Sequence, residues 1–192
     1  AIKAYEGVPI DLKLFHGEEV HPFKNHVHMV NFGGKYSVNE IFEKDPERYY
    51  REVNEIMEKT EVPEGVNAFQ YASCVWCFDR IRESGGLGIF CHPYWIANVY
   101  HIPEKLVDFL FEKKPFDAFE LLGGHEVHSN NMQTAYYNDA RAKGMKIPIV
   151  GASDSHSTNK AGWFKWMYTI VFSRDAELES IQEAVKSMNS VA

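Results

Sequence analysis

The pattern of apolar and polar positions along this chain predicts short strands and amphipathic helices. Residues 10–15 alternate apolar and polar side chains, which is typical of a half-buried strand, and residues 27–32 read as a second strand stopped by Gly33-Gly34. Short apolar runs predict further strands at 87–91, 116–122, 166–172 and from Ile147 into the turn that ends at His156.

Helical spacing and capping residues predict the segments between these strands. Ser37, followed three residues later by Glu40, has the form of a capping box, so we expect a helix there that is interrupted near Pro46 and resumes to about Lys59. The strongest helical pattern covers 67–84, and Gly85-Gly86 ends it. Three further helices are expected from Pro103 onward, over 129–143 and over 175–188.

This order of elements predicts an α/β protein. From about Asn67 onward strands and helices alternate with short connections, which favours a largely parallel sheet, either open or barrel-like. A chain of 192 residues is long enough for one sizeable core, so we expect a single domain over 1–192. Residues 37–66 read as a helical insertion, because strands flank them without a simple crossover.

Composition narrows the classes of function. The net charge of −7 argues against nonspecific nucleic-acid binding, and no apolar run approaches the ~18 residues that a membrane span needs. No signal peptide is visible at the start, and the odd number of cysteines, 3, argues against a disulfide framework. These features predict a cytoplasmic protein in a reducing compartment.

The stretch that ends in Asp154-Ser155-His156 carries the first sign of chemistry. Residues two apart on an extended backbone point the same way, so Asp154 and His156 can aim a carboxylate and an imidazole at one point. An ordinary polar turn after a strand would carry the same residues. Asp154 and His156 are therefore either part of a polar turn or a pair of metal ligands, and other segments of the chain distinguish the two interpretations.

Polar groups recur where the other strands end. Glu19 follows the first expected strand, His28 lies within the second, His92 closes the third and Glu120 sits in the fourth. The ends of parallel strands lie together on one face of an α/β scaffold, so these groups should meet there. Histidine, aspartate and glutamate are ligands for divalent zinc, manganese or iron(II).

Each of these groups also has a structural interpretation. His28 could be a hydrogen-bonded core imidazole, and His92 before Pro93 could simply end a strand. One of Glu18 and Glu19 could be solvated. Glu120 has apolar neighbours, so it should face an interior, where a carboxylate needs a cation or hydrogen-bond donors.

The remaining histidines and the cysteines point less clearly to function. His101, His125 and His128 are expected on loop surfaces, although His125 and His128 lie just past a strand end, where they could reach a substrate. Cys74 and Cys77 fall on the apolar face of a helix and are expected in the core. Cys91 could be a nucleophile, but its apolar strand favours buried packing. The chain has no P-loop, nucleophile elbow or GxGxxG motif.

The combination of motifs resembles the PHP family, named for polymerase and histidinol phosphatase. The resemblance rests on four short segments in order, which are 17–20 with 27–30, 86–93, 119–122 and 151–156. It implies a distorted (β/α)7 barrel with a multinuclear cluster of divalent metals at the carboxyl ends of its strands. By motif, Glu19, His28, His92, Asp154 and His156 would be the metal ligands, and Glu120 would line the site. The His-x-His motif that opens family members is absent, and His26 and His28 do not replace it, so we expect a barrel incomplete by its first two β/α units.

The resemblance implies a metal-dependent phosphoesterase that hydrolyses a small phosphate monoester or nucleotide. His92 or His156 would protonate the leaving oxygen, Glu120 would support the reaction, and Lys160 and Lys165 would hold the phosphate together with His125 and His128. The alternative is a truncated or degenerate barrel without catalysis that serves as a structural or binding module. A third possibility, a carbon–nitrogen hydrolase of the amidohydrolase type, fits His92-Pro93 poorly. An incomplete sheet would also expose an unpaired edge, which favours homo-oligomers.

Overall fold

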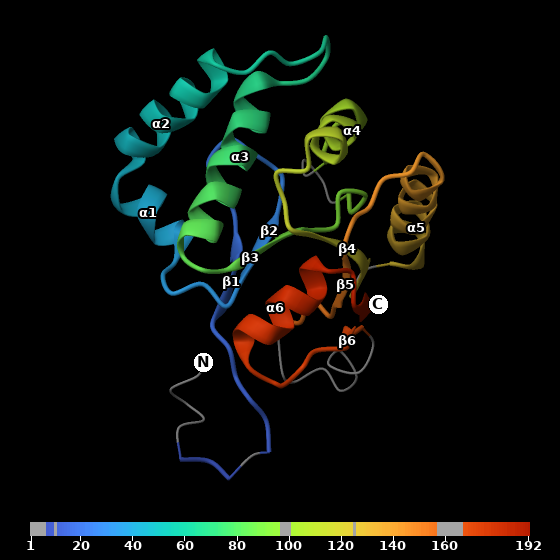
Figure 1. Cartoon of the computed structure of the whole chain (residues 1–192). Coiled ribbons are helices and arrows are strands. Elements are labelled where there is room, and N and C mark those ends of the chain that lie inside the picture. Colours follow the sequence, from blue (N-terminus) through green and yellow to red (C-terminus); the bar gives the residue numbers. More distant parts are fainter. Residues whose placement is uncertain (1–6, 10, 97–100, 125, 157–166) are drawn as a thin grey trace.

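The computed structural model describes residues 7–9, 11–96, 101–124, 126–156 and 167–192. A five-stranded sheet in the order β1-β2-β3-β4-β5 forms its centre, and β6 and β7 pair separately (Figure 1). The strands are β1 Gly17–Val20, β2 Met29–Phe32, β3 Leu87–Phe90, β4 Ala118–Gly123, β5 Ile149–Ala152, β6 Ile170–Val171 and β7 Ser190–Val191. The helices are α1 Val38–Lys44, α2 Pro46–Glu58, α3 Ala68–Glu83, α4 Glu104–Lys113, α5 Val127–Ala142 and α6 Leu178–Lys186.

The main sheet is mixed, whereas the sequence predicted a largely parallel one. Strands β3, β4 and β5 are parallel, with helices in their connections, but β1 pairs antiparallel with β2 and β2 antiparallel with β3. The reversal between β1 and β2 follows from their short connection, which cannot make a parallel crossover. The α/β class is confirmed. Within the described residues the sheet does not close into a barrel, so the (β/α)7 form is not reproduced.

The first strand lies later in the chain than the alternating pattern predicted. Residues 11–16 have no regular structure, and Leu12 and Leu14 are 72% and 41% exposed. Alternation produces a strand only where one face is buried, and residues 11–14 are exposed on both faces, whereas Phe15 packs on Phe32 of β2. The strand is 17–20 instead, held by pairing of Gly17 with Phe32 and Val20 with Met29.

The first three helices begin at capping side chains, of which Ser37 and Asn67 stand where the sequence predicted a helix start. Ser37, Asp45 and Asn67 each accept a hydrogen bond from a backbone N–H of the helix that follows, and Pro46 opens α2. Helix α3 stops at Gly85, whose φ of +79° is the left-handed geometry of a helix terminator. Helix α5 begins two residues before the predicted start, and the strand expected at 166–172 is confined to 170–171, with Trp166 outside the described residues.

The two faces of the main sheet are covered differently. Helices α3, α4 and α5 lie on one side, and α6 crosses the other side (Figure 1). Met29, Phe90 and Phe119 point into the first side, where the main core lies. Their neighbours Val30, Ile89 and Ala118 point to the second side, because side chains alternate along a strand, and meet Val185 of α6 there.

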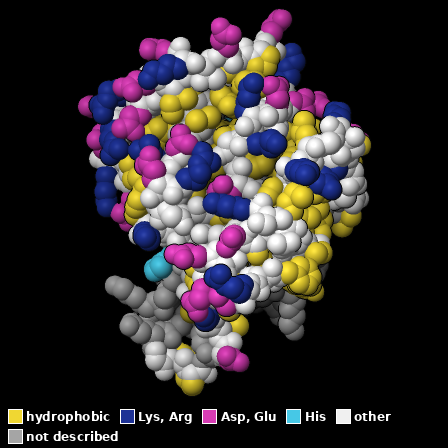
Figure 2. Space-filling view, viewed as in Figure 1, with side chains coloured by type: hydrophobic (Ala, Val, Ile, Leu, Met, Phe, Trp, Pro, Cys, Tyr) yellow, Lys and Arg dark blue, Asp and Glu magenta, His cyan; other side chains and the backbone are white. Residues whose placement is uncertain are grey.

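The segment 37–66 contains α1 and α2, which pack against α3. The Tyr49 hydroxyl lies 2.9 Å from Ser73 Oγ, and the Trp76 indole donates to Glu52 at 2.8 Å. Charged side chains gather over α1 and α2 in Figure 2. On α1, Lys44 pairs with Glu40. The single-domain boundary and the status of this segment as an insertion stay predictions.

Core packing explains the two helical cysteines. Cys74 and Cys77 are fully buried in the main cluster, as predicted. Of the described helices, none has the length and apolar composition needed to cross a membrane.

Candidate metal centre

Two adjacent glutamates on β1 point to opposite faces and have different roles. Glu18 accepts hydrogen bonds from Ser37 Oγ and Val38 N, both at 2.6 Å, and from Asn39 Nδ2 at 2.9 Å. Its half-buried carboxylate therefore satisfies donors at the N-terminus of α1. Glu19 faces the other way, toward the strand ends where the candidate ligands gather.

Glu19 meets two histidines at the edge of β2 and β3. Its Oε1 lies 3.0 Å from His28 Nδ1 and 3.5 Å from His92 Nε2. The same two ring nitrogens are 2.8 Å apart. His28 immediately precedes β2 and His92 follows β3, and the antiparallel register of those strands brings the two together. One carboxylate oxygen and two ring nitrogens therefore converge on one small volume.

Glu120 fixes the orientation of His92. Its Oε2 lies 2.9 Å from His92 Nδ1, and both side chains are almost fully buried. This contact turns Nε2 of His92 toward Glu19 and His28, which is the arrangement in which a carboxylate orients a metal-binding imidazole. Burial alone lowers the pKa of His92, but the hydrogen bond that its ring donates to Glu120 and the nearby carboxylate charges outweigh this effect, so the pKa lies above its usual value.

The carboxylate of Glu19 is held in its charged form. Burial by itself raises its pKa, but hydrogen bonds from His21 and His28 lower it well below the usual range. An ionised carboxylate beside imidazole nitrogens is the donor set that a divalent cation requires.

Asp154 and His156 complete the rim after β5. His156 Nδ1 donates to the backbone carbonyl of Asp154 at 2.8 Å and lies 3.6 Å from its Oδ1. A cavity of about 300 Å3 joins this pair to Glu19, His92 and Glu120. The two side chains line one cavity, but not through the extended backbone that the sequence argument assumed, because β5 ends at Ala152 and the backbone of Asp154 is left-handed.

The backbone is left-handed at two of these positions. His92 has a φ of +27° and Asp154 a φ of +47°, and both follow a strand of the sheet. Such conformations in residues other than glycine cost about 1–3 kcal/mol and are concentrated at functional sites. They turn each side chain out of the strand's alternation and into the cavity.

The donor chemistry fits a bound metal ion. Ligand atoms lie within 4.8 Å of one another in three groups, which are Glu19–His28–His92, Cys91–His92–Glu120 and Glu19–Asp154–His156. Glu19 and His92 each belong to two of these groups. Cys91 is the weakest candidate, because burial raises the pKa of its thiol well above normal and keeps it protonated.

Sequence analysis overlooked His21 and Trp95. His21 Nε2 lies 3.1 Å from Glu19 Oε2, and its ring stacks on His28 with centroids 4.3 Å apart. The hydrogen bond to Glu19 raises the pKa of His21, against an opposing effect of burial. Trp95 packs against both His28 and His92. The only available signal was proximity, since His21 is two residues from Glu19 and Trp95 three from His92.

Several predicted substrate-binding residues stay untested. His128 is exposed in the first turn of α5 and does not line the cavity. Lys160, Lys165 and His125 lie outside the described residues. His101 is exposed, as expected.

Comparison with solved structures identifies the fold. A two-domain protein from Bacteroides vulgatus that contains a predicted PHP-like metal-dependent phosphoesterase matches with a TM-score of 0.56 at 15% identity, over 98% of this chain. A protein from Bifidobacterium adolescentis, described provisionally as a metal-dependent phosphoesterase, matches with a TM-score of 0.50 at 12% identity, over 96% of this chain. The resemblance to the PHP type is therefore confirmed for the fold.

The similarity covers only part of each solved structure. This chain spans 46% of the first structure and 79% of the second. No protein-family model matches the sequence, and no curated protein matches it.

Proposed function

We propose that this protein is a metal-dependent phosphoesterase that hydrolyses a phosphate monoester. The observation that carries the proposal is the convergence of Glu19, His28 and His92 on one volume, with Asp154 and His156 lining the same cavity as Glu19 and His92. The shared fold with PHP-like phosphoesterases supports it. A divalent cation held by these side chains would neutralise charge on phosphoryl oxygens and lower the pKa of a water molecule.

Neighbouring side chains would hold the candidate metal ligands in a fixed orientation. Glu120 holds the His92 ring with Nε2 facing the cavity. His21 holds the second oxygen of Glu19, so that Oε1 stays directed at His28. These fixed contacts reduce the reorganisation needed when substrate and cation bind.

His156 is the residue best positioned to move a proton. Its side chain is 70% exposed, and Nδ1 donates to the carbonyl of Asp154, which leaves Nε2 to hold or release a proton. His156 would either protonate the leaving oxygen or bind the metal ion. A His156→Asn variant separates these two roles. Loss of kcat at unchanged metal content would indicate the acid, and loss of metal would indicate the ligand.

Metal content and phosphatase activity test the proposal together. The purified protein would be freed of metal, reloaded with Mn²⁺ or Zn²⁺, and assayed with p-nitrophenyl phosphate. We expect activity only after loading, and at least a 100-fold loss in His28→Ala and Asp154→Asn. His101→Ala is the matched control, because it removes an exposed imidazole that does not line the cavity.

The alternative is a barrel-derived module that binds without catalysis. Its specific support is the closed contact among Glu19, His28 and His92, in which these polar groups already satisfy one another. Fewer than about one metal ion per chain after loading, with equal negligible rates in both forms, would favour this module over the enzyme.

A further inference from the structure

The α6 side of the sheet is polar at one end and apolar at the other. On β2 this face carries Val30 and Phe32 beyond His28, and on β3 it carries Ile89 and Leu87 beyond Cys91. The register aligns these rows, because Val30 pairs with Ile89 and Phe32 with Leu87. One continuous surface therefore runs from the candidate metal centre into hydrocarbon side chains.

A second cavity lies over the apolar end. It measures about 500 Å3, and its walls come from β2, β3, β5, β6 and α6. Val30 and Ala152 line both this cavity and the one at the metal centre. Its size is within the range of small-molecule sites, roughly 300–1,000 Å3.

The hydroxyl groups in this cavity are already engaged. Thr169 Oγ1 accepts from Gly151 N at 2.9 Å and donates to Gly151 O at 2.8 Å. Ser173 Oγ donates to the carbonyl of Asp175 at 2.6 Å. A cavity whose polar groups are paired offers water few partners, so an apolar occupant would displace little that is well bound.

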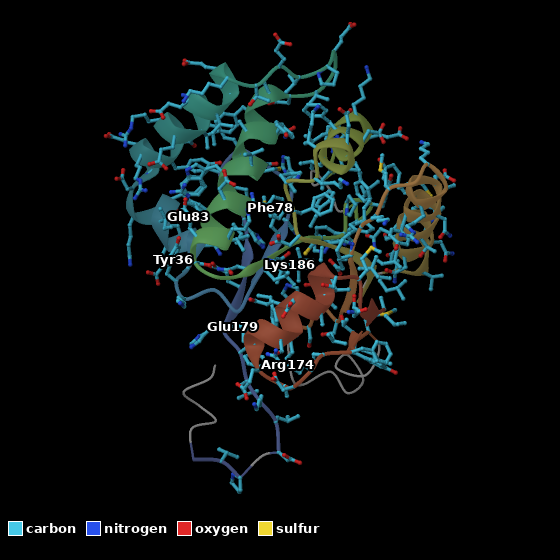
Figure 3. The ribbon with its side chains drawn as sticks, viewed as in Figure 1. Tyr36, Phe78, Glu83, Arg174, Glu179 and Lys186 are labelled. Atoms are coloured by element: carbon cyan, nitrogen blue, oxygen red, sulfur yellow. The ribbon has the colours of Figure 1, made fainter. Side chains whose placement is uncertain are left out.

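Helix α6 holds the roof of the cavity in place. Gln182 donates to the carbonyls of Phe32 at 3.0 Å and Gly85 at 3.1 Å. Ile181 and Val185 line the cavity from the helix. Figure 3 labels the charged residues Glu179 and Lys186 on α6, and Arg174 just before it donates to Ser180 Oγ at 3.0 Å. The cavity is therefore framed by fixed hydrogen bonds at its edges.

We propose that the substrate is an amphiphilic phosphate monoester whose alkyl or aryl group occupies this apolar cavity while its phosphate lies at the metal centre. The proposal rests on the function given above and names its substrate class. The two shared lining residues supply the continuity, since an ester bond located beside Val30 and Ala152 would direct its two halves into the two cavities.

A chain-length series tests this assignment. The affinity of n-alkylphosphonates, which are not hydrolysed, would be measured calorimetrically on the Mn²⁺-loaded protein from methyl to octyl. Burial of each methylene predicts about a fourfold gain in affinity until the cavity is full. The kcat/KM of the matching alkyl phosphates should rise in parallel.

Two variants fill the cavity from different sides. Val171→Trp acts from β6, and Ala176→Trp acts from an exposed position at the rim, where a folding defect is not expected. Both should flatten the dependence of affinity on chain length. Ile170→Trp is the control, because residue 170 is the neighbour on β6 that is 51% exposed and does not line the cavity.

The outcomes separate this inference from the proposed function. Phosphonate affinity that rises with length, without hydrolysis of any phosphate, supports the cavity assignment and removes the enzyme. Hydrolysis that is independent of length keeps the enzyme and overturns the assignment. A dimer in light scattering that Val171→Trp dissociates, with no length dependence, would assign the cavity to a second copy and also overturn it.

Discussion

The two sides of the main sheet differ in how completely they are packed. On the α3 side, Trp76, Tyr49 and Phe78 are at most 1% exposed and belong to one continuous aromatic core. On the α6 side, a small cluster that includes Leu87, Ile89 and Val150 borders the open apolar cavity. The candidate metal centre lies at the end of this second side.

This difference indicates that one side of the sheet mainly stabilises the fold and the other side provides space for a ligand. The densely packed side supplies most of the stability, because burial of large apolar side chains is the dominant favourable term in folding. The loosely packed side retains space and polar groups, which a binding site needs. Substitutions on the two sides should therefore separate loss of folding from loss of ligand, and the effects below run from largest to smallest.

Truncation of Phe78 should be the most damaging change. The ring packs against Gly88, where an added Cβ would lie 2.8 Å from Phe78 Cδ1. We expect Phe78→Ala to lower the free energy of unfolding by about 3–5 kcal/mol, measured by urea denaturation. Phe78→Leu should lose less. A loss below about 1 kcal/mol for the alanine variant would contradict the assignment of stability to this side.

Metal loading should stabilise the protein through the candidate site on the α6 side of the sheet. At a free Mn²⁺ or Zn²⁺ concentration 100 times Kd, binding to the folded state adds about 2.7 kcal/mol. The rise in Tm should be reversed by a chelator. Glu19→Gln should abolish it, because residue 19 contributes to two of the ligand groups. An equal rise in this variant would show that the metal binds elsewhere.

Replacement of Glu18 should lower stability without affecting metal binding, the reverse of what is expected for Glu19. Glu18→Ala removes the carboxylate that accepts from Ser37 and Val38 at the start of α1. We expect about 2 kcal/mol of lost stability in denaturant titrations, because the donors lose a charged partner. Calorimetry should find metal affinity unchanged in the variant. A parallel loss of metal would mean that the two glutamates are not independent.

Truncation of Val185 should be the mildest change. This α6 residue is 3% exposed, but it already borders a cavity. Val185→Ala should therefore lower the free energy of unfolding by about 1 kcal/mol, less than the cost at Phe78. The two denaturation curves, compared at the same temperature, measure the contrast between the sides. Equal losses of stability in Val185→Ala and Phe78→Ala would contradict the difference in packing between the two sides.

Local signals in the sequence predicted the helices well. Ser37, Asn67 and Gly85 act within a few residues of their own position, so the chain encodes these helix ends directly, whereas α4, α5 and α6 have no side-chain cap and the starts of α5 and α6 differ from the prediction. The first strand was misplaced because its pairing depends on β2, and periodicity at 11–15 carries no information about whether a partner or a core is near. The antiparallel half of the sheet was missed for the same reason.

The candidate site was predictable where ligands follow strands. His92 and the Asp154–His156 pair were found from their position at strand ends, and Glu120 from its apolar neighbours. Stacking of His21 on His28 was not predictable, because it depends on how the chain turns between β1 and β2. The roles of these residues in catalysis stay predictions.

The left-handed backbone at His92 and Asp154 has a consequence for the evolution of this fold. Glycine would adopt these conformations without steric penalty, so a drifting lineage could relax the backbone by giving up a ligand. If these two residues bind a cation as proposed, a homologue with glycine at either position should bind it more weakly on a less strained backbone. Under that proposal, backbone handedness at two strand ends would indicate which relatives of low sequence identity have kept the candidate site.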